Sequence, residues 1–266
     1  NRFGQDANKQ FDPTYSLGVS WRMAEEEFVK THLPWINQLN MRATYGVQGN
    51  VVTSVSPDLI TQYQGILPGY NEYYLTISSL PNPLLKWERT KTWNVGLDLQ
   101  LFNGITMSLE YYGRRSNAII NQDIAQEYGM NTMKLNGGRI HNHGLEFSMN
   151  ITPYQRKDFA WTIGFNASKN WNKTQNDDIQ TKANKITKSD FISGSSDRFL
   201  KKGYPLSAFW SYSFAGLDPE TGYPTFNLID FEEADPDIDP TTFLVYSGQK
   251  DPYFTGGVDT RIRYKS

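Results

Sequence analysis

The chain has 266 residues, 26 of them Lys or Arg and 28 Asp or Glu, and its formal net charge at pH 7 is −2. Such a balance gives no basic field for nucleic acid, and the absence of cysteine excludes disulfide scaffolds, thiolate metal sites and cysteine nucleophiles. Aromatic residues make up 14% of a chain with a mean hydropathy of −0.59. This combination is typical of a tyrosine-rich carbohydrate-binding protein or of an outer-membrane barrel.

Seven stretches alternate between apolar and polar side chains, the period-2 pattern of a strand with two unlike faces. In chain order they are residues 14–23, 39–47, 92–101, 105–112, 143–152, 161–168 and 257–265. No stretch approaches the 18 consecutive apolar residues of a transmembrane helix. The sequence therefore predicts an all-β chain with about seven long strands.

Residues 92–113, TWNVGLDLQLFNGITMSLEYYG, give the clearest pattern. Asn103-Gly104 separates two alternating runs and favours a type I′ hairpin turn. The apolar side chains expected on one face are Trp93, Val95, Leu97, Leu99, Leu101, Ile105, Met107 and Leu109. The polar side chains expected on the opposite face are Asn94, Asp98, Gln100 and Glu110, with Glu146 on a later strand.

The connections alternate between long and short. About 40 residues link the second and third strands, about 24 (residues 114–137) follow the fourth, and about 85 precede the last. Short turns fall at Asn103-Gly104 and around residues 153–159. All the long loops would then emerge at one end, which is typical of a transmembrane β-barrel and uncommon in a compact soluble domain.

Strand length agrees with a membrane position. Ten residues rising about 3.4 Å each and tilted by about 40° span roughly 26 Å, close to the ~25 Å apolar band of an outer-membrane barrel. Aromatic residues near strand ends fit interface girdles; they are Tyr15, Trp21, Tyr45, Trp93, Tyr111, Trp161 and Tyr264. On this interpretation the apolar face meets lipid and the polar face meets the lumen. Alternation alone also fits a secreted carbohydrate-binding β-sandwich, which remains the alternative.

Seven strands leave two open edges, which are not viable in a bilayer. We therefore expect residues 1–266 to form part of a larger antiparallel transmembrane β-barrel with long extracellular loops.

Six blocks of sequence resemble, in the same order, SusC/RagA-type TonB-dependent outer-membrane transporters. The block PNPLLKWERTKTWNVGLDLQLFNG is similar to the family's NPxLKWExTxxxNxGLDxxLFxxR and is the most specific match. The six blocks are residues 1–28, 39–50, 81–104, 136–153, 203–224 and 247–257. The resemblance covers nearly the whole chain.

The resemblance implies a 22-stranded barrel in the bacterial outer membrane, filled by a plug and covered by a SusD-like surface lipoprotein. It also implies energy from TonB, acting near the transporter's N-terminus, and oligosaccharides or peptides as cargo. Residues 1–266 would supply strands from the C-terminal half of the barrel wall, without the plug or the N-terminal domains. The protein would then be no enzyme and would need no cofactor.

Three other groups of residues could in principle carry chemistry. His141 and His143 share a strand face, but two imidazoles are fewer than the three or four ligands of a zinc site. The acidic run at residues 230–239 could gather a calcium ion, although it lacks the EF-hand ligand order and Pro236 stiffens it. Asp218 and Glu220 could form a carboxylate pair, yet their Pro and Gly neighbours indicate a turn.

Tyrosines in the loop at residues 63–83 are better candidates for contact with cargo or with the lid, because tyrosine offers rigid amphipathic area. They could equally pack against one another within the loop. The candidates are Tyr63, Tyr70, Tyr73 and Tyr74, with Trp210 and Tyr212 in a later loop.

Overall fold

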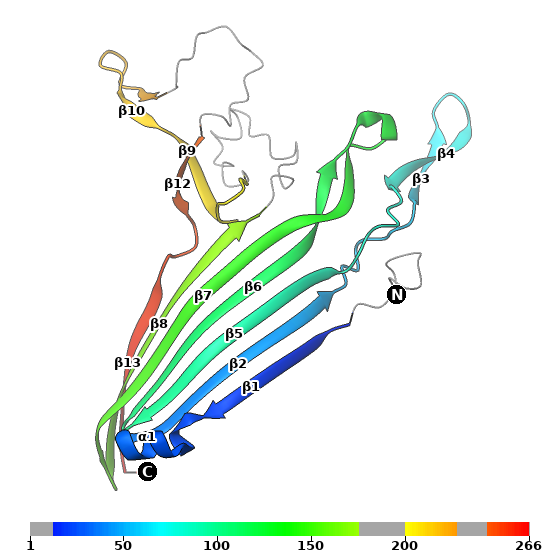
Figure 1. The fold of residues 1–266 in the computed structure, drawn as a ribbon. Coiled ribbons are helices and arrows are strands. Elements are labelled where there is room, and N and C mark those ends of the chain that lie inside the picture. The colour runs from blue at the N-terminus through cyan, green and yellow to red at the C-terminus, as the bar shows by residue number, and fades with distance from the viewer. Residues whose placement is uncertain (1–12, 176–199, 228–243, 266) are drawn as a thin grey trace.

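The computed structural model describes residues 13–175, 200–227 and 244–265, in which seven strands form one tilted antiparallel sheet (Figure 1). The strand order is β1-β2-β5-β6-β7-β8-β13. Their bounds are β1 Tyr15–Arg22, β2 Ile36–Asn50, β5 Glu88–Leu101, β6 Ile105–Asp123, β7 Thr132–Arg156, β8 Phe159–Thr174 and β13 Thr255–Tyr264. All seven strands predicted from alternation are present, and their order follows the chain.

Six shorter strands form three two-stranded sheets: β3 with β4, β9 with β12, and β10 with β11. Their bounds are β3 Ile60–Leu67, β4 Glu72–Ser79, β9 Ala208–Tyr212, β10 Phe214–Leu217, β11 Pro224–Phe226 and β12 Leu244–Gln249. Helical turns are few: η2 Met23–Glu25, α1 Glu27–His32 and η3 Gln126–Tyr128. Within the described ranges, no helix is long and apolar enough to cross a membrane.

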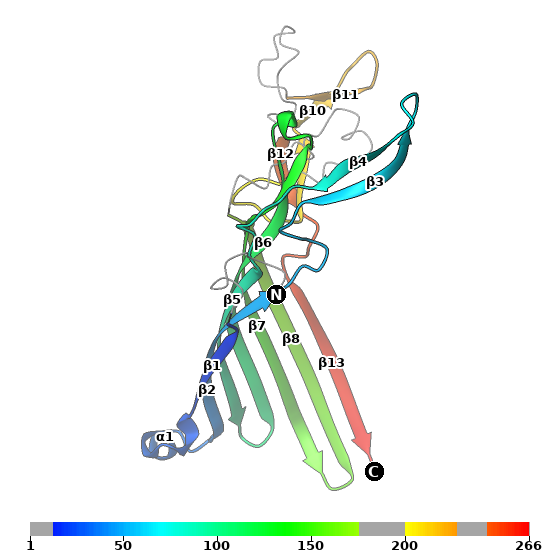
Figure 2. The ribbon, with the colours of Figure 1, turned by 90° about the vertical axis from the view of Figure 1, so that its right-hand side faces the viewer.

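The two ends of the sheet differ, as the loop lengths predicted. The three small sheets and the tip joining β6 to β7 lie at one end, called here the loop end (Figures 1 and 2). The tight turns β5–β6 and β7–β8 lie at the other, the turn end, together with η2 and α1.

Of the seven long strands, β6 and β7 extend furthest beyond the lengths that the sequence indicated. β6 has 19 residues and β7 has 25, and they pair as far as Asp123 opposite Thr132. Only residues 124–131 connect them, so the predicted connection of about 24 residues is wrong. Alternation ends near Gly113 because the outer part of this hairpin no longer separates two uniform faces. Residues that precede β5 contact it there, and Ile119 packs against Val55 and Leu85.

The β5–β6 turn is displaced by one residue from the predicted Asn103-Gly104 position. Phe102 and Asn103 have φ of 49° and 57°, the positive values that the two central residues of a type I′ turn require, and Gly104 N–H donates to Leu101 O at 3.2 Å. Gly104 follows the turn and lies against β7, where a Cβ would come within 3.1 Å of Thr152 O. Glycine at position 104 therefore allows the chain to lie close to the neighbouring strand.

The sheet has no central hydrophobic core. The apolar face is open, with Val95 38% and Leu97 36% exposed, and buried apolar residues gather mainly in two small clusters beside the loops. Among the described residues no second sheet packs against the apolar face, so the β-sandwich alternative is wrong. β1 and β13 each pair with a single strand and are exposed along their whole length.

Candidate functional site

The register assigns each predicted residue to one of two faces. Directly opposite residues share a face, and successive residues alternate. Trp93 lies opposite Tyr45, Leu97 opposite Leu109, and Leu99 opposite Met107, so the eight predicted apolar residues form one surface. The predicted polar residues Asn94, Asp98, Gln100, Glu110 and Glu146 all lie on the other.

An ion-paired network crosses three strands on the polar face. Arg42 on β2 contacts Glu110 on β6 through its Nη2, which also lies 3.6 Å from Asp98 Oδ1 on β5. Asn94 Nδ2 donates to the second oxygen of Glu110 at 2.9 Å, and Ser108 Oγ donates to Asp98 at 2.8 Å. Asp98 and Glu110 are thus held by charge and by hydrogen bonds.

Gly96 makes this network possible. It lies opposite both Arg42 and Glu110, so the arginine side chain must pass over β5 to reach its partner. A Cβ at position 96 would lie 3.0 Å from Arg42 Cγ and closer still to Nε. Only glycine leaves room for this crossing.

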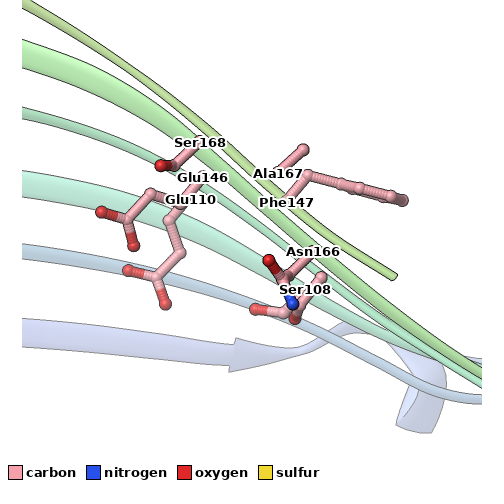
Figure 3. A pocket seen from close by; sticks show the side chains of 8 residues that line it. Ser108, Glu110, Glu146, Phe147, Asn166, Ala167 and Ser168 are labelled. Carbon is pink, nitrogen blue, oxygen red and sulfur yellow. The ribbon is translucent and has the colours of Figure 1, made fainter. Parts of the chain in front are cut away.

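Two shallow hollows lie on the polar face around the carboxylates of Glu110 and Glu146, which are directly opposite each other on β6 and β7. One, of about 330 Å³, is lined by Ser108, Asn166 and Ser168 besides the two glutamates. Figure 3 shows both glutamates pointing to the same side of the sheet, away from Phe147. The second, of about 600 Å³, extends toward the loop end. The face offers polar, acidic contact area.

The β3–β4 hairpin carries the tyrosines predicted to contact a ligand, and it projects from the sheet (Figure 2). Tyr63, Tyr70 and Tyr73 are well exposed, Tyr74 is half-buried, and the rings of Tyr63 and Tyr73 lie 5.8 Å apart. The register places further apolar side chains beside them; together they form the apolar side of the hairpin, namely Tyr63, Ile66, Tyr73, Leu75 and Ile77, all exposed.

Ile66, Leu75 and Ile77 were missed from the sequence, where this segment was assigned to a loop. A signal existed, because Tyr73, Leu75 and Ile77 alternate with polar residues after the Pro68-Gly69 turn.

Trp210 and Tyr212 have different surroundings. Trp210 is only 1% exposed and packs with Ala208 and Leu244, and Tyr204 and Tyr246 cover its ring. This group is called the loop core. Trp210 therefore packs within its own loop and is not available to contact cargo or the lid. Tyr212 is half-buried beside it.

Burial changes the acidity of the tyrosines in the loop core. Burial raises the pKa of Tyr212. Burial also raises the pKa of Tyr246 to about 12, helped by a 3.0 Å hydrogen bond between its hydroxyl and that of Tyr253. Both phenols stay neutral at physiological pH and serve as packing groups.

The remaining chemical candidates have structural roles or lie outside the described residues. The Asp218 carboxylate accepts the backbone N–H groups of Glu220 and Thr221 at 2.9 and 2.8 Å, which closes the turn before β11 and lowers the Asp218 pKa. His143 stacks on Trp171, with centroids 5.1 Å apart. No group of three or more His, Cys, Asp or Glu in the described ranges could hold a metal. The acidic run at residues 230–239 is outside those ranges.

A family model described as TonB dependent receptor-like, beta-barrel, matches residues 1–265. The chain belongs to this family. Its members are outer-membrane β-barrels, which agrees with a sheet that exposes one apolar and one polar face.

Curated relatives support the assignment. The chain is 27% identical to TonB-dependent receptor P3 of Formosa agariphila and 28% identical to TonB-dependent receptor SusC of Bacteroides thetaiotaomicron. Each alignment covers 100% of this chain but only 28% and 27% of the relative. The chain therefore spans just over a quarter of the length of these receptors.

Solved structures show the same fold. The RagAB peptide transporter superposes with a TM-score of 0.75 at 22% identity, covering 99% of this chain and 28% of that one. The RagAB peptide importer in its open-open state gives a TM-score of 0.77 at 21% identity, with the same coverage. The antiparallel barrel fold predicted from the sequence is thereby confirmed.

Proposed function

We propose that this chain forms part of the wall and the extracellular loops of a TonB-dependent importer in the bacterial outer membrane. The observation that carries the proposal is the division of one sheet into an exposed apolar face and an ion-paired polar face, with every small loop sheet at one end. Lipid would cover the apolar face and shield its exposed Leu and Val side chains from water. The polar face would line the lumen.

The open edges of the sheet support a position within a larger barrel. An unpaired strand edge is not tolerated in hydrocarbon, because its backbone N–H and C=O groups find no partner there. β1 and β13 would therefore pair with further strands of the same transporter. A plug would rest against the hollows around Glu110 and Glu146, and TonB would act through the N-terminal region outside these residues.

The β3–β4 hairpin supports a protein partner at the extracellular mouth. A two-stranded hairpin is marginally stable alone, and five apolar side chains on one side remain exposed. A SusD-like surface lipoprotein that closes over the mouth would bury this side. Tyr63, Tyr70, Tyr73 and Tyr74 would then contact the lipoprotein or the cargo, and Tyr212 would be a secondary contact.

Oligosaccharides and peptides are the two candidate classes of cargo. The resemblance to SusC/RagA-type transporters implies both, and the superposed RagAB structures are those of a peptide transporter. The test measures uptake of labelled peptides and labelled oligosaccharides by cells with and without this protein. We expect one class to lose uptake when either this protein or TonB is removed. Undiminished uptake of both classes without the protein would contradict the proposal.

The hairpin can be tested separately. Tyr73→Ser with Leu75→Ser should sharply reduce co-purification of the surface lipoprotein with the transporter. Gln62→Ala with Thr76→Ala changes a directly opposed pair on the other side of the same hairpin and should leave co-purification unchanged. Equal loss in both double variants would point to a general defect of the hairpin instead of a specific interface.

A further inference from the structure

The apolar face becomes basic at its loop end. Across neighbouring strands, Lys91 lies opposite Arg115, Arg115 opposite His141, and His141 opposite Lys173. Lys169 projects from the same face of β8, opposite Leu145. Lys91, Arg115, Lys169 and Lys173 are all exposed and are called here the basic patch.

The basic patch has no carboxylate partner among the described residues. Taken over the described residues, none of its members forms an ion pair with a carboxylate, and no Asp or Glu projects from this face anywhere along the seven paired strands below the β6–β7 bulge. Like charges directly opposite each other destabilise a sheet. The polar face, by contrast, pairs Arg42 with two acidic residues. Within the described ranges, no carboxylate offsets the charges on the apolar face, and an external anion beside them would.

Aromatic side chains mark the level at which the patch begins. Trp93 and Tyr111 lie 5.2 Å apart, Tyr111 and His143 6.5 Å, and His143 stacks on Trp171. Lys169 Nζ lies 5.0 Å from the centroid of the Trp171 ring. Aromatic residues concentrate at the boundary between acyl chains and headgroups. Most of the patch therefore lies on the headgroup side of that boundary.

Arg115 is arranged to receive an anion with two oxygens. Its Nε donates to Nε2 of His141 at 3.1 Å, so that imidazole nitrogen accepts and the ring carries no charge. The two terminal guanidinium nitrogens have no partner in the described part of the chain. A guanidinium held in this way matches phosphate in a two-point contact, and neighbouring lysines add point charges.

We propose that the basic patch binds the phosphorylated headgroup of a glycolipid in the outer leaflet of the outer membrane. The proposal rests on the membrane orientation given under the proposed function, in which the loop end is extracellular. The acyl chains would lie along Val95, Leu97 and Leu109, and the phosphates would meet Arg115, Lys91 and Lys173. The bound lipid would fix the height of this part of the barrel wall in the outer leaflet.

The test uses the full-length transporter, purified from outer membranes, delipidated in mild detergent and titrated with bisphosphorylated lipid A by native mass spectrometry. The triple variant Lys91→Gln, Arg115→Gln, Lys173→Gln should bind this lipid roughly a hundredfold more weakly, since each basic residue beside an anionic surface is worth about fivefold in affinity. Lipid A stripped of phosphate should bind wild type and variant equally and weakly.

A matched control removes three charges at the turn end: Lys30→Gln, Arg156→Gln, Lys157→Gln. It should bind bisphosphorylated lipid A as wild type does. The single variant Lys173→Gln, expected to lose about fivefold, serves if the triple variant does not insert. Two results would overturn the proposal. One is that the patch variants bind bisphosphorylated lipid A with wild-type affinity. The other is that the wild-type protein binds dephosphorylated lipid A as tightly as bisphosphorylated lipid A.

Inorganic phosphate distinguishes a lipid site from a site for free anions. If inorganic phosphate displaced the lipid at matched concentration, the assignment to a lipid would be wrong. Failure of the proposed function gives a different result, because the wild-type protein would then be missing from the outer-membrane fraction.

Discussion

Replacing Leu97 by arginine tests the lipid-facing assignment. Leu97 is four residues from Trp93 and four from Leu101, about 14 Å along the strand in each direction. At a tilt of about 40° this places it roughly 10 Å below the aromatic level, near the middle of a ~25 Å apolar band. An arginine there costs about 2–4 kcal/mol, which is roughly a 30- to 700-fold loss in the folding equilibrium.

The measurement is the free energy of unfolding in lipid vesicles, from urea titrations followed by heat-modifiable gel migration of the full-length protein. Gln100→Arg is the matched control, because Gln100 lies on the same strand but on the polar face. We expect it to cost less than about 1 kcal/mol. Equal losses for Leu97→Arg and Gln100→Arg would refute the assignment of faces.

Three further predictions concern the network, the turn and the loop core. Gly96→Val should displace Arg42 and cost about 1–3 kcal/mol in the same unfolding assay, because it separates a half-buried charge network. Gly65→Val, on the projecting hairpin, should leave the network intact. Lowering the pH should open the turn at Asp218, because the pKa of this carboxyl is depressed in the folded state. The stabilisation is fully present above the unfolded pKa of about 3.9 and is lost as the pH falls through the folded pKa. Hydrogen exchange should show this opening in wild type but not in Asp218→Asn. Trp210→Ala should destabilise the loop core by about 3–5 kcal/mol and speed its proteolysis, while Trp210→Phe should do so less.

The sequence predicted the seven-stranded sheet well because an apolar and a polar face impose alternation on each strand. Val95, Leu97 and Leu99 must differ from Asn94 and Asp98 wherever lipid and water lie on opposite sides. The number and order of the seven long strands, and the division of their residues between two faces, followed from this pattern.

Outside the seven-stranded sheet the pattern is weaker. The outer halves of β6 and β7 contact residues that precede β5, as in the 2.7 Å hydrogen bond from Lys86 N–H to Asn136 Oδ1, and they do not alternate strictly. In the β3–β4 hairpin the alternation is short and was not read as a strand. The Arg42–Glu110 contact could not be predicted from the sequence either, because it depends on the register that places Gly96 between the two residues. Burial of Trp210 required the pairing of β9 with β12, which lie far apart in the chain.

The central claim is that alternate residues of β5 face lipid and lumen. Residues 1–266 contain no cysteine, so single cysteines introduced at positions 93–100 of a cysteine-free transporter can each carry one fluorescent label. In vesicles with brominated acyl chains, we predict strong quenching at Val95→Cys, Leu97→Cys and Leu99→Cys and little at Asn94→Cys, Asp98→Cys and Gln100→Cys. Uniform quenching along the strand, or quenching confined to the even positions, would contradict the account.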